Sequence, residues 1–281
     1  MIKQKKIAWI TDSTASLSKE YIQRHNIHVV PLEIIFEDAS YKENVDITAE
    51  EFYKKLSQAK ELPKTSQPAI GEFINLYEGL QKEYEHAIAI HASSALTGTY
   101  QTSVSAAQMV GYNIEIIDSK IGSYPLGKMI KKGIEMEEQG KSYKEIVEYL
   151  RSLPEKGRLY IAPGSLEQLH KGGRVSTTQA IIGNLIKLKL IVRFEDGKVV
   201  LFDKIRTDKK VKVRLFEIFA EEAHLVKEAS IVHGNDEERA EQWRQELQEM
   251  YPHITFTTTM FSPVPGTHTG QGTIGLSWLN E

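Results

Sequence analysis

Cysteine is absent from this chain of 281 residues. Its absence excludes disulfide bonds, thiolate nucleophiles and zinc sites built on cysteine. An excess of one charge is also missing, because 35 basic residues nearly balance 38 acidic ones and leave a net charge of −3. A chain without a basic excess does not favour nucleic acid as a partner.

Long apolar runs are missing as well. No run approaches the roughly 18 residues of a membrane-spanning helix. The N-terminal apolar run ends at Thr11-Asp12-Ser13, too early for the apolar region of a signal peptide. We therefore expect a cytoplasmic protein with no integral membrane segment.

The motifs of several enzyme classes are missing or incomplete. The chain has no Gly-x-Ser-x-Gly nucleophile elbow, and its histidines form no tight ligand pair, so we predict no metal site. Gly122-x-x-x-x-Gly127-Lys128 has the spacing of a phosphate-binding loop. However, Met129 stands where that loop needs Ser or Thr, and Pro125 lacks a backbone N–H. We interpret the match as chance and keep nucleotide binding as a third hypothesis.

What is present is an alternation of apolar strands and amphipathic helices. In the first half, strands are expected at 7–11, 27–35 (interrupted at Pro31), 87–92 and 113–118, helices at 68–83 and 98–110, and a polar loop at 60–67. This order favours a parallel sheet with helices on both faces. In the second half, Asp196-Gly197 is a strong hairpin signal. We predict two α/β domains: residues 1–157 with a mainly parallel sheet, and residues 158–281 with a mixed or antiparallel sheet.

Hydroxyl groups gather where the expected strands end. They lie in Thr11-Asp12-Ser13-Thr14, Thr65-Ser66-Gln67-Pro68 and the segment 93–99, while the last glycine-rich loop, 266–275, carries His268. Ligands of open α/β sheets bind at the carboxyl ends of strands, and helix starts favour anions. Each hydroxyl alone is explained as well by an N-cap or a turn. As a set they predict an anion site.

Other polar residues have simpler interpretations. Asp12 and Asp118 end strands, where turn formation is the first explanation, and His91 is expected in the core. Arg174 follows the helix stop Gly172-Gly173, and Arg206 follows the hairpin. Both arginines suit carboxylate or phosphate recognition, and both suit a solvated helix end equally well.

Taken together, six segments resemble the successive blocks of the DegV family, the fatty-acid-binding subunits of bacterial fatty-acid kinases. The blocks are Ile10–Thr14, 65–68, 93–101, 117–120, 169–174 and 266–272. The resemblance implies a long-chain fatty acid bound between two α/β domains, with no other cofactor and no catalysis by this chain. It implies that the carboxylate is held by Thr65, Ser66, Ser94, Thr97 and His268. It also implies a separate kinase subunit that phosphorylates this carboxylate to an acyl phosphate and contacts Arg174 and Arg206.

The chain departs from the family pattern at two positions. Thr97 stands where serine is usual and keeps the hydroxyl, and Ala69 follows Pro68 where many members have serine.

A fatty acid gains affinity mainly from its tail, at about 0.8 kcal/mol per buried methylene. Candidate tunnel walls, which core packing explains equally well, are Ile181, Ile182, Leu185, Ile186 and Leu188 of an expected helix at 177–188. The alternative function is a stand-alone hydrolase or phosphotransferase that uses the strand-end Ser, Asp and His groups.

Overall fold

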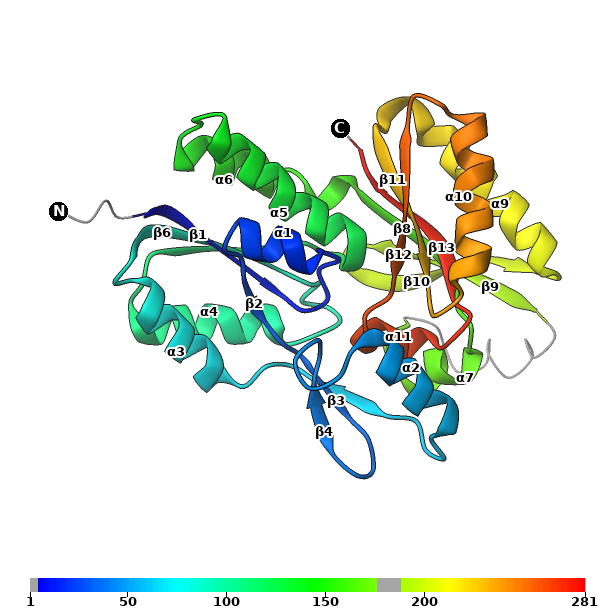
Figure 1. Cartoon of the computed structure of the whole chain (residues 1–281), viewed down its shortest axis with the longest axis horizontal. Helices are drawn as coiled ribbons and strands as arrows, with labels where there is room; N and C mark the ends of the chain where they lie inside the picture. Colours follow the sequence, from blue (N-terminus) through cyan, green and yellow to red (C-terminus); the bar gives the residue numbers. More distant parts are fainter. Residues whose placement is uncertain (1–4, 176–187, 281) are drawn as a thin grey trace.

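The computed structural model describes residues 5–175 and 188–280. Two α/β lobes lie side by side, with a small third sheet below them (Figure 1). No helix within these ranges is both long and apolar enough to cross a membrane.

The first lobe is built on a four-stranded parallel sheet of order β2-β1-β6-β7. Its strands are β1 (Lys5–Asp12), β2 (His28–Val30), β6 (Tyr84–His91) and β7 (Ile114–Asp118). Its helices are α1 (Lys19–Arg24), α3 (Ile70–Leu80), α4 (Thr99–Val110), α5 (Ser123–Glu138) and α6 (Tyr143–Arg151). The predicted parallel sheet is confirmed.

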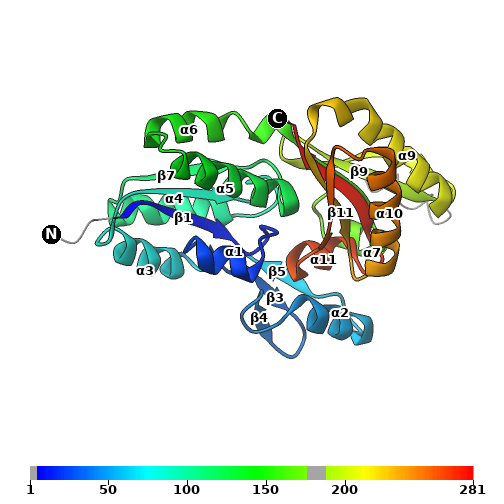
Figure 2. The ribbon, with the colours of Figure 1, turned by 45° about the horizontal axis from the view of Figure 1, so that its top comes forward.

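Helices cover both faces of this sheet because β1 alternates its side chains. Ala8 and Ile10 pack with α3 and α4, whereas Ile7 and Trp9 pack with α5 and α6. Figure 2 shows the two helix pairs on opposite sides of the sheet. Ser142 and Glu145 form the capping box that opens α6.

The second lobe is built on a mixed six-stranded sheet of order β10-β9-β8-β13-β11-β12. Its strands are β8 (Gly157–Ala162), β9 (Lys189–Glu195), β10 (Lys198–Ile205), β11 (Glu228–His233), β12 (Thr255–Met260) and β13 (Ile274–Leu279). Its helices are α7 (Leu166–Lys171), α9 (Asp208–Glu222), α10 (Glu237–Met250) and α11 (Pro263–Thr269), with short 3₁₀ turns at Pro154–Lys156 and Ala223–Leu225. Only β11 and β12 pair in parallel.

The predicted hairpin joins β9 to β10. Asp196 and Gly197 both have positive φ, at 48° and 78°. Two positive φ values match the right-handed twist of the flanking strands, which explains why this dipeptide marks the turn.

A third sheet was not expected from the sequence. Strands β3 (Glu33–Ile35), β4 (Ser40–Lys42) and β5 (Lys64–Ser66) form an antiparallel sheet beside α2 (Ala49–Gln58). The expected single strand at 27–35 is two strands in different sheets, separated at Pro31, and the expected loop at 60–67 contains β5. These strands have three residues each, too few to show an alternation.

The last glycine-rich segment also differs from expectation. His268 lies on the short helix α11 and not in a loop; Pro263 supplies a proline in its first turn. The many glycines of this segment made the sequence resemble a loop, so the helix was not predicted. Gly266 is needed for packing, since a Cβ there would lie 2.7 Å from the Tyr53 hydroxyl of α2.

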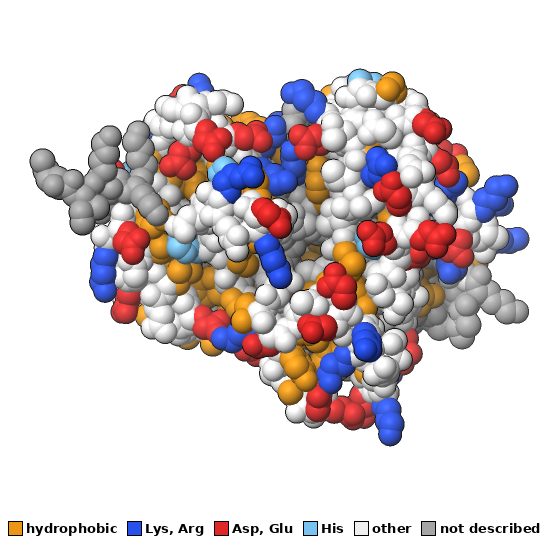
Figure 3. All heavy atoms as spheres, in the orientation of Figure 1, with side chains coloured by type: hydrophobic (Ala, Val, Ile, Leu, Met, Phe, Trp, Pro, Cys, Tyr) orange, Lys and Arg blue, Asp and Glu red, His pale blue; other side chains and the backbone are white. Residues whose placement is uncertain are grey.

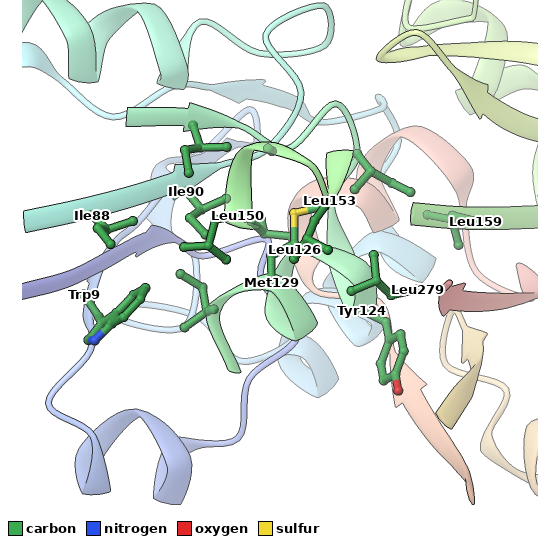
Figure 4. Close-up of a cluster of buried hydrophobic side chains, with 14 of the residues drawn as sticks. Trp9, Ile88, Ile90, Tyr124, Leu126, Met129, Leu150, Leu153, Leu159 and Leu279 are labelled. Atoms are coloured by element: carbon green, nitrogen blue, oxygen red, sulfur yellow. The ribbon is translucent and has the colours of Figure 1, made fainter. Parts of the chain in front are cut away.

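One hydrophobic cluster spans both lobes. Figure 4 shows Trp9, Ile88 and Ile90 of the first sheet beside residues of α5 and α6, with Leu159 and Leu279 of the second sheet at the other side. Lys128 Nζ on α5 also donates to Glu228 Oε2 on β11 at 2.8 Å. The second sheet begins at Gly157, next to the predicted boundary, and the division at 157/158 remains a prediction.

Candidate functional site

A cavity of about 700 Å³ lies between the lobes. Its volume is typical of a site for a small molecule, about 300–1,000 Å³. Apolar side chains from both lobes line most of it. They are Leu32, Ala92, Ala95, Leu96, Ile121, Leu159, Ile161, Leu169, Val175, Phe194, Val199, Phe261, Val264 and Pro265.

All five residues that the resemblance assigns to the carboxylate line this cavity. They come from β5, from the loop between β6 and α4, and from α11. The structure thus brings together segments more than 200 residues apart in the sequence, as between Thr65 and His268. Whether they bind a carboxylate remains a prediction.

Thr65 and His268 contact each other directly. His268 Nε2 lies 2.9 Å from Thr65 Oγ1. The other ring nitrogen, Nδ1, is buried and has no hydrogen-bond partner. Burial, and secondarily the nearby charge of Arg174, lowers the pKa of His268 to about 4. The imidazole is therefore neutral at physiological pH, and the fixed charge near it is that of Arg174.

One residue leaves room for the His268 ring, and another holds the start of the helix that carries it. Gly172, just after α7, leaves room for the ring, because a Cβ there would lie 2.5 Å from His268 Nδ1. At the start of α11, the buried carboxylate of Glu43 accepts the Val264 N–H at 2.7 Å and the hydroxyl of Ser13. Burial raises the pKa of Glu43 to about 7. The sequence analysis interpreted Gly172 as a helix stop and did not single out Glu43, because neither belongs to a strand-end cluster of hydroxyls.

The pleat of β5 separates Thr65 from Ser66. Thr65 pairs with the fully buried Ile34, whereas Ser66 pairs with Glu33 on the opposite face. Ser66 donates to the carbonyl oxygen of Gln67 at 3.1 Å and also lines a second, more open hollow beside the cavity. Gln67 lies in the wall between the two spaces and donates to Thr102 at 2.7 Å.

Ser94 and Thr97 lie in the loop that joins β6 to α4. Ser94 is exposed, and its hydroxyl donates to Asp118 Oδ2 at the end of β7. Thr97 Oγ1 lies 2.8 Å from Thr99 Oγ1. Ser93, the residue before Ser94, donates to the carbonyl oxygen of Gly197 at 2.6 Å. The turn of the β9–β10 hairpin therefore contacts this loop.

The two arginines lie in different places. Arg174 lines the cavity and donates to the carbonyl oxygens of Gly172 at 2.6 Å and Leu96 at 3.4 Å. Burial lowers the pKa of its guanidinium. Arg206 follows Ile205, at the opposite end of β10 from the cavity residue Val199. At about 3.3 Å per strand residue, these ends are roughly 20 Å apart. Arg206 is therefore not a cavity residue.

The strand-end groups Asp12 and His91 form a buried series of hydrogen bonds inside the first lobe. Asp12 Oδ2 accepts from the Ala92 N–H at 2.8 Å and lies 3.3 Å from His91 Nδ1. His91 Nε2 lies 3.0 Å from Ser103 Oγ. Burial alone would raise the pKa of Asp12, but its hydrogen bonds hold that pKa below the usual value.

This Asp–His–Ser order resembles a hydrolytic triad, but it has no opening for a substrate. Asp12, His91 and Ser103 have no exposed surface, and none of them lines the cavity. Tyr77 contacts Ser103 on its remaining side. This series of hydrogen bonds therefore stabilises the first lobe, and the expected core position of His91 is confirmed.

Other candidates also contribute no ligand site. Lys128 is 4% exposed and bonded to Glu228, which disagrees with a phosphate-binding loop. Within the two described ranges, no cluster of three His, Asp or Glu side chains is placed to hold a metal. The proposed tunnel residues Ile181, Ile182, Leu185 and Ile186 fall outside the described residues. Leu188 is described and half-buried, but it does not line the cavity.

Comparison with known proteins agrees with this architecture. The sequence profile described as "Uncharacterised protein, DegV family" matches residues 6–281, so the chain belongs to the DegV family. A DegV domain-containing protein of Staphylococcus aureus is 42% identical over 276 residues, covering 97% of this chain and 98% of the relative.

Two solved structures share this fold. The crystal structure of DegV from Bacillus subtilis, described as a fatty acid binding protein, superimposes with a TM-score of 0.90 at 37% identity, covering 98% of this chain and 99% of the other. The Streptococcus pneumoniae Fatty Acid Kinase B3 protein, loaded with linoleic acid, gives a TM-score of 0.83 at 17% identity, covering 99% and 100%. At that lower identity the likeness shows the fold alone.

Proposed function

We propose that this protein binds a long-chain fatty acid in the cavity between its lobes. The observation that carries the proposal is the cavity itself, which has mostly apolar walls and also carries hydroxyl groups, one neutral imidazole and the guanidinium of Arg174. A tail gains affinity from apolar burial, while the headgroup needs hydrogen bonds that offset its desolvation. The fatty-acid-binding description of the Bacillus subtilis structure supports the same ligand.

The carboxylate would lie near Thr65, Ser66, Ser94, Thr97 and His268. These five side chains are neutral, which suits a carboxylate that must later leave as an acyl phosphate, because a direct ion pair would hold it more strongly. Arg174 also lines the cavity, but its guanidinium donates to the carbonyl oxygens of Gly172 and Leu96. We further propose that a separate kinase subunit carries out that phosphorylation and that this chain is a non-catalytic carrier. The family resemblance supports this step. Because the carrier must meet a kinase that uses ATP, we also propose the cytoplasmic location that the sequence predicts.

Native mass spectrometry of the protein purified from bacteria tests the binding step. We expect a fatty acid bound to the wild-type chain and little or none bound to Ala95→Trp, which places a large ring on an exposed cavity residue. Ala220→Trp is the matched control, since Ala220 is an exposed residue of α9 away from the cavity. Equal occupancy in all three proteins, or none in the wild type, would contradict the proposal.

Coupled acyl-phosphate formation with the kinase subunit tests the carrier step. Arg206→Ala should lower turnover and leave fatty-acid occupancy unchanged, because Arg206 is exposed and lies outside the cavity, and an exposed charge affects encounter with a partner more than folding. Raised salt should reproduce the loss, since it screens such charges. Arg174→Ala should lower occupancy as well, because Arg174 joins the end of α7 to the carbonyl oxygen of Leu96. Full turnover by Arg206→Ala at low salt would refute its docking role.

A further inference from the structure

Asp118 contacts the cavity residue Ser94, and the proposed function assigns it no role. It ends β7, next to the end of β6, and is half-buried. Its Oδ1 accepts two backbone N–H groups, from Lys120 at 2.9 Å and from Ser94 at 3.2 Å. Its Oδ2 accepts the hydroxyl of Ser94. The two backbone bonds fix the orientation of the carboxylate, and so fix Oδ2 against Ser94.

Ser94 has only one hydroxyl proton. In this structure the proton goes to Asp118, although Ser94 lines the cavity. A fatty-acid carboxylate accepts hydrogen bonds and donates none at neutral pH, so it needs the same proton. Two carboxylates therefore compete for one donor. If Ser94 turns to the ligand, Asp118 keeps its two backbone donors and the competition is reversible.

We propose that Asp118 is a positioning residue that weakens the hold of Ser94 on the ligand carboxylate and so keeps the headgroup ready for transfer. This inference rests on the proposed fatty-acid binding. An acceptor that competes for the hydroxyl lowers ligand affinity without filling the cavity. The strand-end turn explains the backbone bonds to Oδ1, but it does not require the bond from Ser94 to Oδ2.

The substitution Asp118→Asn inverts the hydrogen bond with almost no change of shape. The amide oxygen should keep the Oδ1 position, because an NH₂ group there would face two backbone N–H donors. The amide NH₂ then takes the place of Oδ2 and donates to Ser94. Ser94 becomes an acceptor on that side, and its own proton is free to point into the cavity.

The test is a double-mutant cycle on the delipidated full chain, with palmitate binding measured by calorimetry. We expect Asp118→Asn to tighten binding roughly threefold to tenfold, the fold-change of one ordinary hydrogen bond. In the Ser94→Ala background the same change should have no effect. Asp203→Asn is the charge-matched control, since Asp203 lies on β10 outside the cavity lining, and it should leave the affinity unchanged.

Each outcome decides the proposal. Equal tightening with and without Ser94 would mean that only the lost charge matters, and would overturn it, as would unchanged or weaker binding by Asp118→Asn. No binding by the wild type would overturn the proposed function as well. Should Asp118→Asn unfold, Asp118→Ala takes its place, because it also removes the acceptor at Oδ2. It should tighten palmitate binding, and Ser94→Ala should abolish that gain; unchanged or weaker binding by Asp118→Ala overturns the proposal.

Discussion

At the scale of single residues, the neutral imidazole of His268 determines how the site responds to pH. Its ring is enclosed beside Arg174, with Nδ1 buried and unpaired and Nε2 against Thr65. Protonation would place a second positive charge in this space. The folded protein therefore resists protonating His268, whereas the unfolded chain does not.

The resulting prediction is a loss of stability at mildly acidic pH. The pKa of His268 is lowered from 6.5 to about 4, so the unfolded state binds more protons between these values. The stabilising contribution is fully present above pH 6.5 and is lost as pH falls toward 4, by on the order of 2–3 kcal/mol. We expect the wild type to lose this free energy of unfolding relative to His268→Gln, as measured by urea denaturation at several pH values.

Comparison with His268→Gln cancels the pH-dependent contributions of the titratable groups that both proteins share. Glu43 acts in the opposite direction, because its pKa is raised to about 7 and its protonated form is the one that the fold favours. Its contribution is lost as pH rises through 7 in both proteins. A difference between the wild type and His268→Gln that stays constant from pH 4 to 7 would contradict the prediction.

At the scale of elements, the β9–β10 hairpin connects the two lobes through its turn. The Gly197 carbonyl oxygen accepts the hydroxyl of the buried Ser93, which precedes the cavity residue Ser94. Gly197 has a φ of 78°, and a Cβ at this position would lie 2.6 Å from Ser93 Oγ. The turn thus needs glycine for both its backbone and its neighbour.

Gly197→Ala and Gly140→Ala separate these two requirements. Gly140 has the same φ of 78° but has open space around its missing Cβ. We expect Gly140→Ala to cost about 1 kcal/mol of unfolding free energy from the left-handed backbone alone. Gly197→Ala should cost at least about 1 kcal/mol more, because overpacking adds to the strain. Urea denaturation of both variants measures the difference, and equal losses would show that the hairpin tip does not press on Ser93.

At the scale of the whole molecule, the cluster of Figure 4 makes the two lobes one hydrophobic unit. Trp9 and Leu159 belong to different sheets yet to the same cluster. The Lys128–Glu228 bond adds a link in which the lysine is almost fully buried. On the face seen in Figure 3, acidic and basic side chains are intermixed and form no large patch of one charge.

A shared core predicts that the ligand-free protein unfolds in one cooperative transition. Separating the lobes would expose Leu159, Leu279 and their neighbours to water, which makes a half-unfolded state unfavourable. Differential scanning calorimetry should give one peak whose calorimetric enthalpy equals the van't Hoff enthalpy. Leu159→Ala should move the whole peak to lower temperature. Two resolved peaks, with only one of them moved by Leu159→Ala, would show that residues 1–157 and 158–281 unfold as independent domains.

Local pattern was enough to determine most elements and the order of the fold. Short continuous apolar runs placed β1 and β6, and Asp196-Gly197 marked the hairpin. The spacing of Thr48–Glu51 and Ser142–Glu145 is that of the capping boxes that open α2 and α6. Hydroxyl groups at strand ends also pointed to the edge of the first sheet where the cavity lies. These signals depend on residues a few positions apart, so the sequence displays them directly.

Only the tertiary structure decided how the candidate site is arranged. The contact between Thr65 and His268, the opposite faces of Thr65 and Ser66, and the bond from Ser94 to Asp118 depend on which strands pair and in what register. Short elements such as β5 and α11 left no readable period, because three or seven residues cannot display one. Sequence therefore determined which chemical groups gather between the lobes, while strand pairing and packing decided which of them contact one another.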